Sequence, residues 1–182
     1  MFERQSIPDV ILVPPKRHGD ARGFFSETYS AETYEAAGIP GPFVQDNHAF
    51  SQEAGVLRGL HFQKPPAAQA KLIRCTQGAI FDVAVDIRQG SPTYGKWVGA
   101  TLSAENGAQL YVPEGFAHGY LTLTPNCHVQ YKVSDYYAPD QEGGIAWDDP
   151  GLAIAWPLDG LSVTLSEKDQ CLTALSALPA IF

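Results

Sequence analysis

Short apolar runs, rich in β-branched and aromatic residues, recur along the chain about every ten positions. Turn-forming clusters such as "RQGSPTYG", "SAENG" and "TPN" separate these runs. Short strands that alternate with turns are typical of an all-β sandwich or barrel, and we expect that fold class here. The expected strands are "VILVP", "GFFSETY", "GVLRGLHF", "AKLIRCT", "AIFDVAVDI", "KWVGATLS", "AQLYVP", "AHGYLTLT" and "HVQYKVSDYY".

Two stretches carry helical signals instead. "SAETYEAAG" has Ser30 as a possible N-cap and Gly38 as a stop, and "SEKDQCLTALSAL" has Ser166 as a possible N-cap. The chain contains no internal repeat, low-complexity tract or linker. We therefore expect residues 1–182 to form one β domain with short flanking helices.

The composition narrows the class of protein. A chain of 182 residues with 45% hydrophobic content can bury one sizeable core. A net charge of −8 without a basic stripe argues against nucleic-acid and anionic-membrane partners. No apolar stretch approaches the roughly 20 residues of a membrane span, and "MFERQSIPDV" lacks the features of a signal peptide. We therefore expect a cytoplasmic protein.

The cysteines do not indicate a disulfide framework or a zinc site. Cys75, Cys127 and Cys171 are odd in number, widely spaced and outside CxxC pairs. We expect them to be buried as small hydrophobic residues.

Two motifs resemble those of the cupins, a class of jelly-roll barrels. The segment "GAQLYVPEGFAH", from Gly107 to His118, matches the second cupin motif in full. The first motif is kept only in outline, because Gly55 and His61 have the right spacing while Gln63 replaces the second histidine. The resemblance implies a double-stranded β-helix, or jelly-roll, barrel.

The first motif lacks residues that a metal site would need. Lys71 occupies the position of the motif's glutamate. An ammonium group has no lone pair, so two of four metal ligands are lost. We expect no metal, and we expect His61, Lys71 and His118 to line one cavity.

A histidine beside a lysine suits proton removal next to a carbonyl group. A neutral imidazole is a good base near pH 7, and an ammonium can stabilise an enolate oxygen. The alternative is a packed core histidine, but His61 alternates with Gly59 and Gln63 in a polar row that a dry core would disfavour. Tyr131 is a candidate acid, although spacing alone would allow any barrel tyrosine or none.

The chain as a whole strongly resembles the dTDP-4-dehydrorhamnose 3,5-epimerase family. That resemblance implies a homodimer that needs no metal or other cofactor. It also implies epimerisation of a dTDP-4-keto-6-deoxy sugar at C3 and C5, on the way to dTDP-L-rhamnose. The matching segments, in order, are "GDARGFFSETY", "FVQDNHAFS", "GVLRGLHFQ", "QAKLIRC", "IFDVAVDIR", "SPTYGKWVG", "LYVPEGFAHGYL", "YKVSDYYAP" and "LSEKDQ".

The resemblance assigns four catalytic residues. His61 would remove the C5 and C3 protons with Asp169 as its dyad partner, Lys71 would hold the C4 oxygen, and Tyr131 would be the acid on the opposite ring face. Two structural alternatives stay open. Asp169 and Ser166 have the spacing of a helix capping box, and Tyr131 could be an amphipathic core residue.

The resemblance also assigns a substrate-binding set, part of which would come from the partner subunit. Asp82 would support this set, although His118 and Asp82 could instead be simple polar packing. Arg22 and Glu27 could be a mere surface ion pair. The set comprises Arg22, Glu27, Gln45, Asn47, Arg58, His118 and Tyr137.

Two features of the sequence depart from this assignment. Strict alternation puts Arg58 and His61 on opposite strand faces, unless a bulge at Gly59 reunites them. His18 stands where many relatives have a phenylalanine against the base, which weakens the case for thymine. Three other functions remain: an epimerase acting at C3 or C5 alone, a non-catalytic sugar-binding cupin, and a metal-dependent cupin enzyme.

Overall fold

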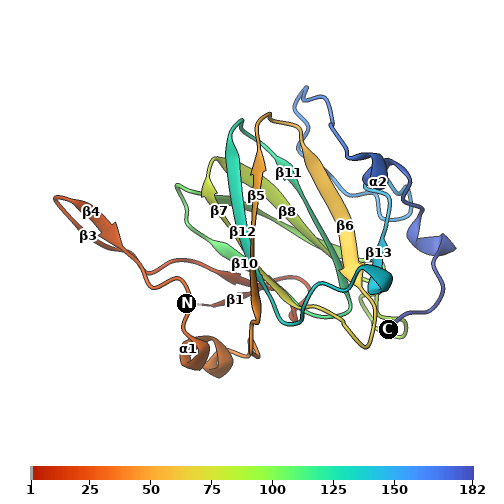
Figure 1. Ribbon diagram of the computed structural model, residues 1–182, viewed down its shortest axis with the longest axis horizontal. Coiled ribbons are helices and arrows are strands. Elements are labelled where there is room, and N and C mark those ends of the chain that lie inside the picture. The colour runs from red at the N-terminus through yellow and green to blue at the C-terminus, as the bar shows by residue number, and fades with distance from the viewer. Residues whose placement is uncertain (1) are drawn as a thin grey trace.

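Two antiparallel sheets face each other and form the body of the protein, as the computed structural model of residues 2–182 shows (Figure 1). The six-stranded sheet has the order β1 (Glu3–Arg4), β2 (Ile11–Val13), β10 (Gln109–Val112), β7 (Lys71–Gln77), β12 (Cys127–Val133) and β5 (Gln45–Ser51). The five-stranded sheet has the order β13 (Glu142–Gly144), β6 (Leu57–Gln63), β11 (Phe116–Thr122), β8 (Ala79–Asp86) and β9 (Trp97–Ser103).

The main core lies between the two sheets, and a second core lies behind the five-stranded sheet. Strand β8 serves both cores: Ile80 and Ala84 face the first, whereas Val83 and Val85 face the second. This double burial explains why "AIFDVAVDI" is almost continuously apolar. The second core is covered by the C-terminal segment, which brings in Trp156 and further apolar side chains.

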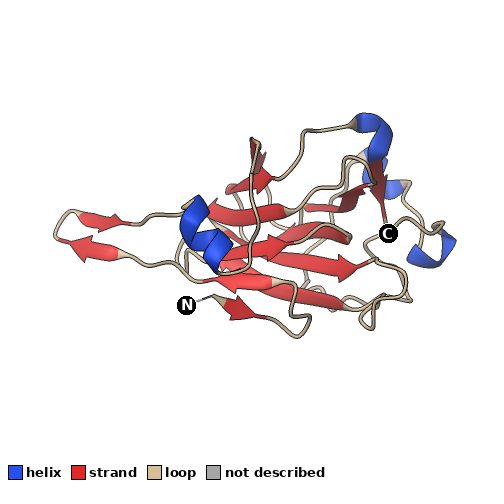
Figure 2. Ribbon diagram, turned by 90° about the horizontal axis from the view of Figure 1, so that it is seen from below, coloured by secondary structure: helices blue, strands red, loops and turns tan. Residues whose placement is uncertain are grey.

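A two-stranded hairpin of β3 (His18–Asp20) and β4 (Gly23–Phe25) projects from this body (Figures 1 and 2). All six residues of the two strands are exposed. The exposed fractions of Phe24 and Phe25 are 61% and 71%. The two neighbouring rings give the hairpin an exposed apolar surface.

The strand predictions were confirmed, and they were incomplete. Each of the nine apolar runs contains a strand. The pattern did not predict β1, β3, β5 or β13, because these strands are short or carry many polar residues. The last predicted strand is too long, since β12 ends at Val133 rather than continuing to Tyr137.

The first helix was predicted well and the second was predicted too long. Helix α1 (Ala31–Ala36) follows Ser30 and ends before Gly38, whose φ is +85°. Helix α2 (Glu167–Gln170) has only four residues, and a short 3-10 helix, η2 (Leu175–Ala177), follows it. A second 3-10 helix, η1 (Pro139–Gln141), directly precedes β13. Beyond α2 the backbone bonds to a distant segment instead of continuing the helix, since the Leu175 amide donates to Asp149.

Two of the three cysteines are buried as expected. Cys75 and Cys127 lie in the core between the sheets, but Cys171 is exposed, because it directly follows α2 at the surface. No helix within residues 2–182 is long and apolar enough to span a membrane.

Candidate active site

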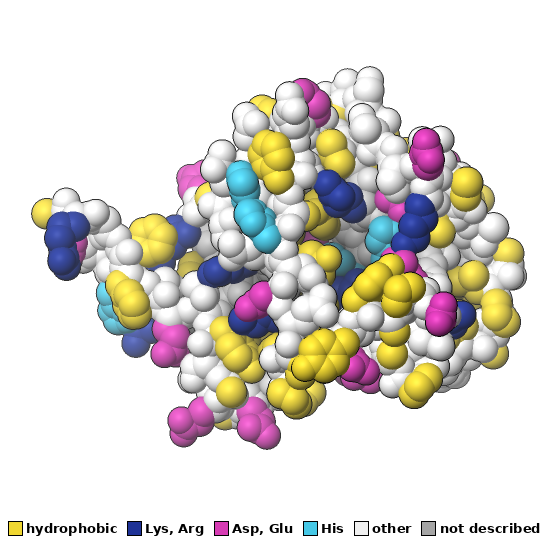
Figure 3. Space-filling model, viewed as in Figure 1, with side chains coloured by type: hydrophobic (Ala, Val, Ile, Leu, Met, Phe, Trp, Pro, Cys, Tyr) yellow, Lys and Arg dark blue, Asp and Glu magenta, His cyan; other side chains and the backbone are white. Residues whose placement is uncertain are grey.

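A cavity of about 400 Å³ opens between the two sheets beside α2. In the space-filling view, histidine, lysine and arginine side chains gather in this hollow (Figure 3). Arg58, His61, Lys71, His118 and Tyr131 line the cavity, as do residues of α2. The prediction that His61, Lys71 and His118 share one cavity is thereby confirmed.

A bulge at Gly59 places Arg58 and His61 on the same side of β6. His118 of β11 pairs with His61, and Tyr120 pairs with Arg58, so three residues of β6 span two steps of β11. Gly59 has a φ of +120°, and a Cβ there would approach the His118 carbonyl oxygen to 2.7 Å. Only glycine fits this position, and the bulge expected from the sequence is present.

His61 and Asp169 form a dyad in which the aspartate is buried and the histidine is partly exposed to the cavity. The Nε2 atom of His61 lies 2.6 Å from Oδ1 of Asp169, and the Asp169 side chain is 4% exposed. Burial lowers the pKa of His61, while the Asp169 carboxylate opposes that shift. The ring is therefore largely neutral near pH 7, with Nδ1 left to accept a proton.

Asp169 also belongs to the helix cap, through a different group. Its backbone N–H donates to the Ser166 hydroxyl over 3.1 Å, as expected at the start of a helix. Its carboxylate is directed at His61 instead. The two roles that the sequence left as alternatives are thus compatible.

Lys71 reaches the cavity from the opposite sheet. Its Nζ atom lies 3.4 Å from the carbonyl oxygen of His61. Burial lowers the pKa of Lys71 to about 8, and the charges of Asp82 and Glu142 oppose the shift. Tyr131 lies on β12 in the same sheet, and burial raises its pKa, so its phenol keeps its proton at neutral pH.

His118, which also lines the cavity, forms a second histidine–aspartate pair. Its Nε2 atom lies 2.8 Å from Oδ1 of Asp82, and both side chains are buried. Asp82 thus contacts His118 directly, and its charge also acts on Lys71.

A smaller hollow adjoins the cavity and contains three further predicted residues. Gln45, Asn47 and Tyr137 line this hollow together with His61 and Lys71. The Gln45 amide donates to Asn47 over 2.9 Å, and the Tyr137 amide donates to Gln45 over 3.3 Å. The structure therefore brings these three predicted residues next to the dyad.

The family model for dTDP-4-dehydrorhamnose 3,5-epimerases matches residues 4–177 of this chain. The chain belongs to this epimerase family. It is 50% identical over 181 residues to the dTDP-4-dehydrorhamnose 3,5-epimerase of Sinorhizobium fredii, an alignment that covers 100% of this chain and 92% of the relative. The protein is therefore an isomerase of the carbohydrate-epimerase class.

Solved epimerase structures have the same fold. The dTDP-6-deoxy-D-glucose-3,5-epimerase of Legionella pneumophila, in complex with dTDP-4-keto-L-rhamnose, is 47% identical with a TM-score of 0.94, over 99% of this chain and 95% of that one. A 3'-monoepimerase of Streptomyces bikiniensis, in complex with dTDP-quinovose, is 37% identical with a TM-score of 0.88, over 96% and 87%. These similarities confirm the predicted jelly-roll fold.

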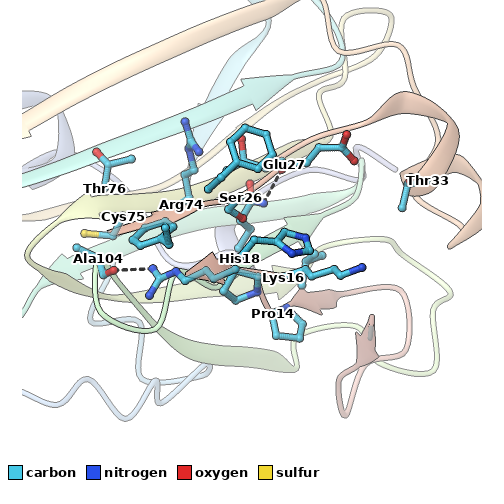
Figure 4. A pocket seen from close by; sticks show the side chains of 18 of the residues that line it. Pro14, Lys16, His18, Ser26, Glu27, Thr33, Arg74, Cys75, Thr76 and Ala104 are labelled. Carbon is cyan, nitrogen blue, oxygen red and sulfur yellow. Dashed lines mark hydrogen bonds between the residues drawn. The ribbon is translucent and has the colours of Figure 1, made fainter. Parts of the chain in front are cut away.

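Two of the predicted substrate-binding residues, Arg22 and Glu27, lie away from the His61–Asp169 dyad of the same chain. Arg22 lies at the tip of the projecting hairpin, and its side chain is 90% exposed. Glu27 lines a separate hollow of about 640 Å³ at the root of the hairpin, together with His18 and Arg74 (Figure 4). The alternative of an Arg22–Glu27 ion pair is wrong, because Arg22 pairs with its near neighbour Asp20.

Sequence reasoning missed two charged residues, Lys168 in the cavity and Glu142 in the adjoining hollow. Lys168 of α2 forms an ion pair with Glu142 of β13, which in turn accepts a hydrogen bond from the Tyr137 hydroxyl over 2.9 Å. The position of Lys168 beside Asp169 was a weak signal for it. Nothing local marked Glu142, because its place depends on the pairing of β13 with β6.

Among residues 2–182, no three histidine, cysteine or acidic side chains converge as metal ligands do. The position taken by the ligand glutamate in cupins holds the Lys71 ammonium, which faces the cavity. The donor set is therefore that of an acid–base site.

Proposed function

We propose that this epimerase converts dTDP-4-dehydro-6-deoxy-D-glucose to dTDP-4-dehydro-L-rhamnose, by inverting C3 and C5 in dTDP-L-rhamnose biosynthesis. The observation that carries the proposal is the His61–Asp169 dyad, which shares one cavity with Lys71 and Tyr131. A base, a cation and an acid are the groups that enolisation and reprotonation require. No metal or other cofactor has to take part.

In this proposal His61 removes the proton at C5 through Nδ1, and Asp169 stabilises the imidazolium that forms. The C–H electron pair moves into the ring, and negative charge develops on the C4 oxygen beside the Lys71 ammonium. Tyr131 then donates its proton to the opposite face of C5. His61 must lose a proton and Tyr131 must regain one, through solvent, before the same steps occur at C3.

The nucleotide would extend from the dyad toward the cavity mouth. Arg58 already donates to the Phe50 carbonyl over 3.1 Å, which holds its guanidinium at the cavity edge where a diphosphate could bind. Gln45, Asn47, His118 and Tyr137 would contact the sugar and nucleotide, with Asp82 supporting His118. Glu142 and Lys168 lie close enough to join them.

The proposal includes a homodimer in the cytoplasm. The exposed Phe24 and Phe25 give the hairpin an apolar face that a second copy could cover. Arg22 and Glu27 would then serve the partner's cavity, since they lie away from their own. The acidic net charge of −8 suits a protein that avoids nucleic acid.

The test is proton NMR of dTDP-4-keto-6-deoxyglucose incubated with the protein in heavy water. We expect deuterium at both C3 and C5 with the parent protein, and at neither carbon with His61→Asn. The Tyr131→Phe variant, which keeps the base, should still exchange protons but convert the sugar far more slowly.

The similarity to a 3'-monoepimerase supports a second candidate, inversion at one carbon only. The base and acid would be the same, so the labelling pattern decides between the two. Deuterium at a single carbon would refute double epimerisation, and no exchange at all would refute both candidates.

A further inference from the structure

Tyr120 is a buried tyrosine whose hydroxyl the proposed mechanism does not use. It lies on β11, where it pairs with Arg58 of β6 on one side and with Asp82 of β8 on the other. Its side chain lines the cavity that contains the dyad, and the residue is only 4% exposed. Its hydroxyl finds no hydrogen-bond partner among the protein atoms of residues 2–182.

Tyr34 is a comparably buried tyrosine whose hydroxyl is hydrogen-bonded within the protein. It is 5% exposed, and its hydroxyl donates to the Thr28 carbonyl over 2.8 Å and accepts from Gln109 over 2.9 Å. A buried hydroxyl without a partner costs free energy, so such groups are rare unless a ligand satisfies them. The unpaired hydroxyl of Tyr120 therefore indicates a group that binds in the cavity.

The surroundings of Tyr120 define which ligand group fits. Burial raises the pKa of Tyr120, so the phenol remains a neutral donor. Oδ2 of Asp82, across the strand pair, is also buried without a hydrogen-bond partner in the described chain. A sugar hydroxyl can accept from the phenol and donate to the carboxylate. An ionised phosphate oxygen could accept from the phenol, but it has no proton to donate to Asp82 and would be repelled by its charge.

We propose that the Tyr120 hydroxyl donates a hydrogen bond to a hydroxyl group on the hexose of the bound nucleotide sugar. Tyr120 is then a substrate-binding residue, and the enzyme favours a sugar that keeps the hydroxyl at that position. The inference rests on the proposed function only in taking a nucleotide sugar as the ligand.

The test compares Tyr120→Phe with Tyr34→Phe, two changes that each remove one hydroxyl from a buried ring. For Tyr120→Phe we expect kcat/KM to fall about fivefold, the effect of one neutral hydrogen bond, while Tm does not fall. For Tyr34→Phe we expect the reverse, a lower Tm with kcat/KM unchanged. Titration calorimetry with dTDP and dTDP-glucose supplies a readout that needs no turnover.

In that titration, Tyr120→Phe should weaken dTDP-glucose binding and leave dTDP binding unchanged. Equal weakening of both would place the contact on the dTDP part of the ligand and overturn the assignment to the hexose. A lower Tm with unchanged binding would show that the hydroxyl is structural. If the parent protein binds dTDP-glucose but exchanges no deuterium, the proposed function fails while the Tyr120 contact is still tested.

Discussion

At the scale of single residues, Lys71 gives the cavity its chemistry. An ammonium at the position of a metal-binding carboxylate repels cations and offers a positive charge to an oxyanion. Burial lowers the pKa of Lys71 to about 8, which is close to physiological pH, so the side chain loses its proton more readily than an exposed lysine. Activity should therefore depend on pH through Lys71 as well as through His61.

The sign of each limb follows from the two pKa shifts. The base must be neutral, and burial lowers the pKa of His61, so kcat/KM should rise as pH passes the acid side of neutrality. The cation must be charged, so kcat/KM should fall as pH rises through about 8. In Lys71→Arg the guanidinium stays charged, and the alkaline limb should move to higher pH even if the rate is lower.

A coupled assay with a 4-keto reductase, read as NADPH consumption from about pH 5 to about pH 10, would measure both limbs. Lys96→Arg is the matched control, because Lys96 is exposed and does not line the cavity. An alkaline limb that stays in place in Lys71→Arg would mean that another group controls it.

A residue's place in the cavity could be predicted where a local motif fixes it. Glycine spacing around His61, Lys71 and His118 was enough to place them together, because it reflects strand and turn lengths. Glu142 and Tyr120 gave no such signal. Their surroundings come from strands that are distant in the chain, and a polar side chain in a strand has no local mark of its function.

At the scale of elements, Asp169 of the four-residue helix α2 combines a cap contact with the proposed orientation of His61. The backbone N–H serves the cap and the carboxylate serves His61, so the two roles can be separated by mutation. Asp169→Asn keeps the N–H and the shape but loses the charge that stabilises an imidazolium. We expect a loss in kcat of at least about 100-fold with little change in the free energy of unfolding.

Glu167→Gln is the control for that variant, since it removes an exposed charge from the same turn of the helix. It should leave kcat unchanged. Denaturant unfolding measured beside the kinetics separates the roles. If Asp169→Asn lost stability but kept its kcat per folded molecule, the carboxylate would matter only to the helix.

Helices and strands were predictable from the sequence where a local pattern of residues determines them. Alternating apolar residues between turns gave nine strands, and Ser166 with Asp169 gave the start of α2. Strand β5 was missed, because Asp46 and His48 on its outward face are polar or charged and its inward residues Gln45 and Asn47 line a hollow rather than a core. The end of α2 was missed because a distant aspartate, Asp149, holds the following segment.

At the scale of the whole molecule, one question is whether a single subunit contains a complete site. The cavity contains the His61–Asp169 dyad, Lys71, Tyr131 and Arg58. Arg22 and Glu27 instead lie on or beside a hairpin that projects from the body. An arm with an exposed arginine and two bare phenylalanines is suited to reaching a second copy. If it does, each site is shared between subunits.

Subunit mixing tests this sharing. His61→Asn and Arg22→Ala should each abolish most activity alone, the first by removing the base and the second by removing a diphosphate contact. In a mixed dimer one site carries both changes and the other carries neither. Unfolding and refolding equal amounts together should therefore restore about a quarter of the parent activity, as random pairing predicts.

The same mixture with Phe24→Ser and Phe25→Ser added to both chains is the control. These changes should weaken the dimer, seen as a lower mass in analytical ultracentrifugation, and should prevent the restoration. If His61 and Arg22 instead serve the same site within one subunit, every chain in the mixture carries a defective site. No activity would then return, although the dimers would form normally, and the hairpin would have to act within its own subunit.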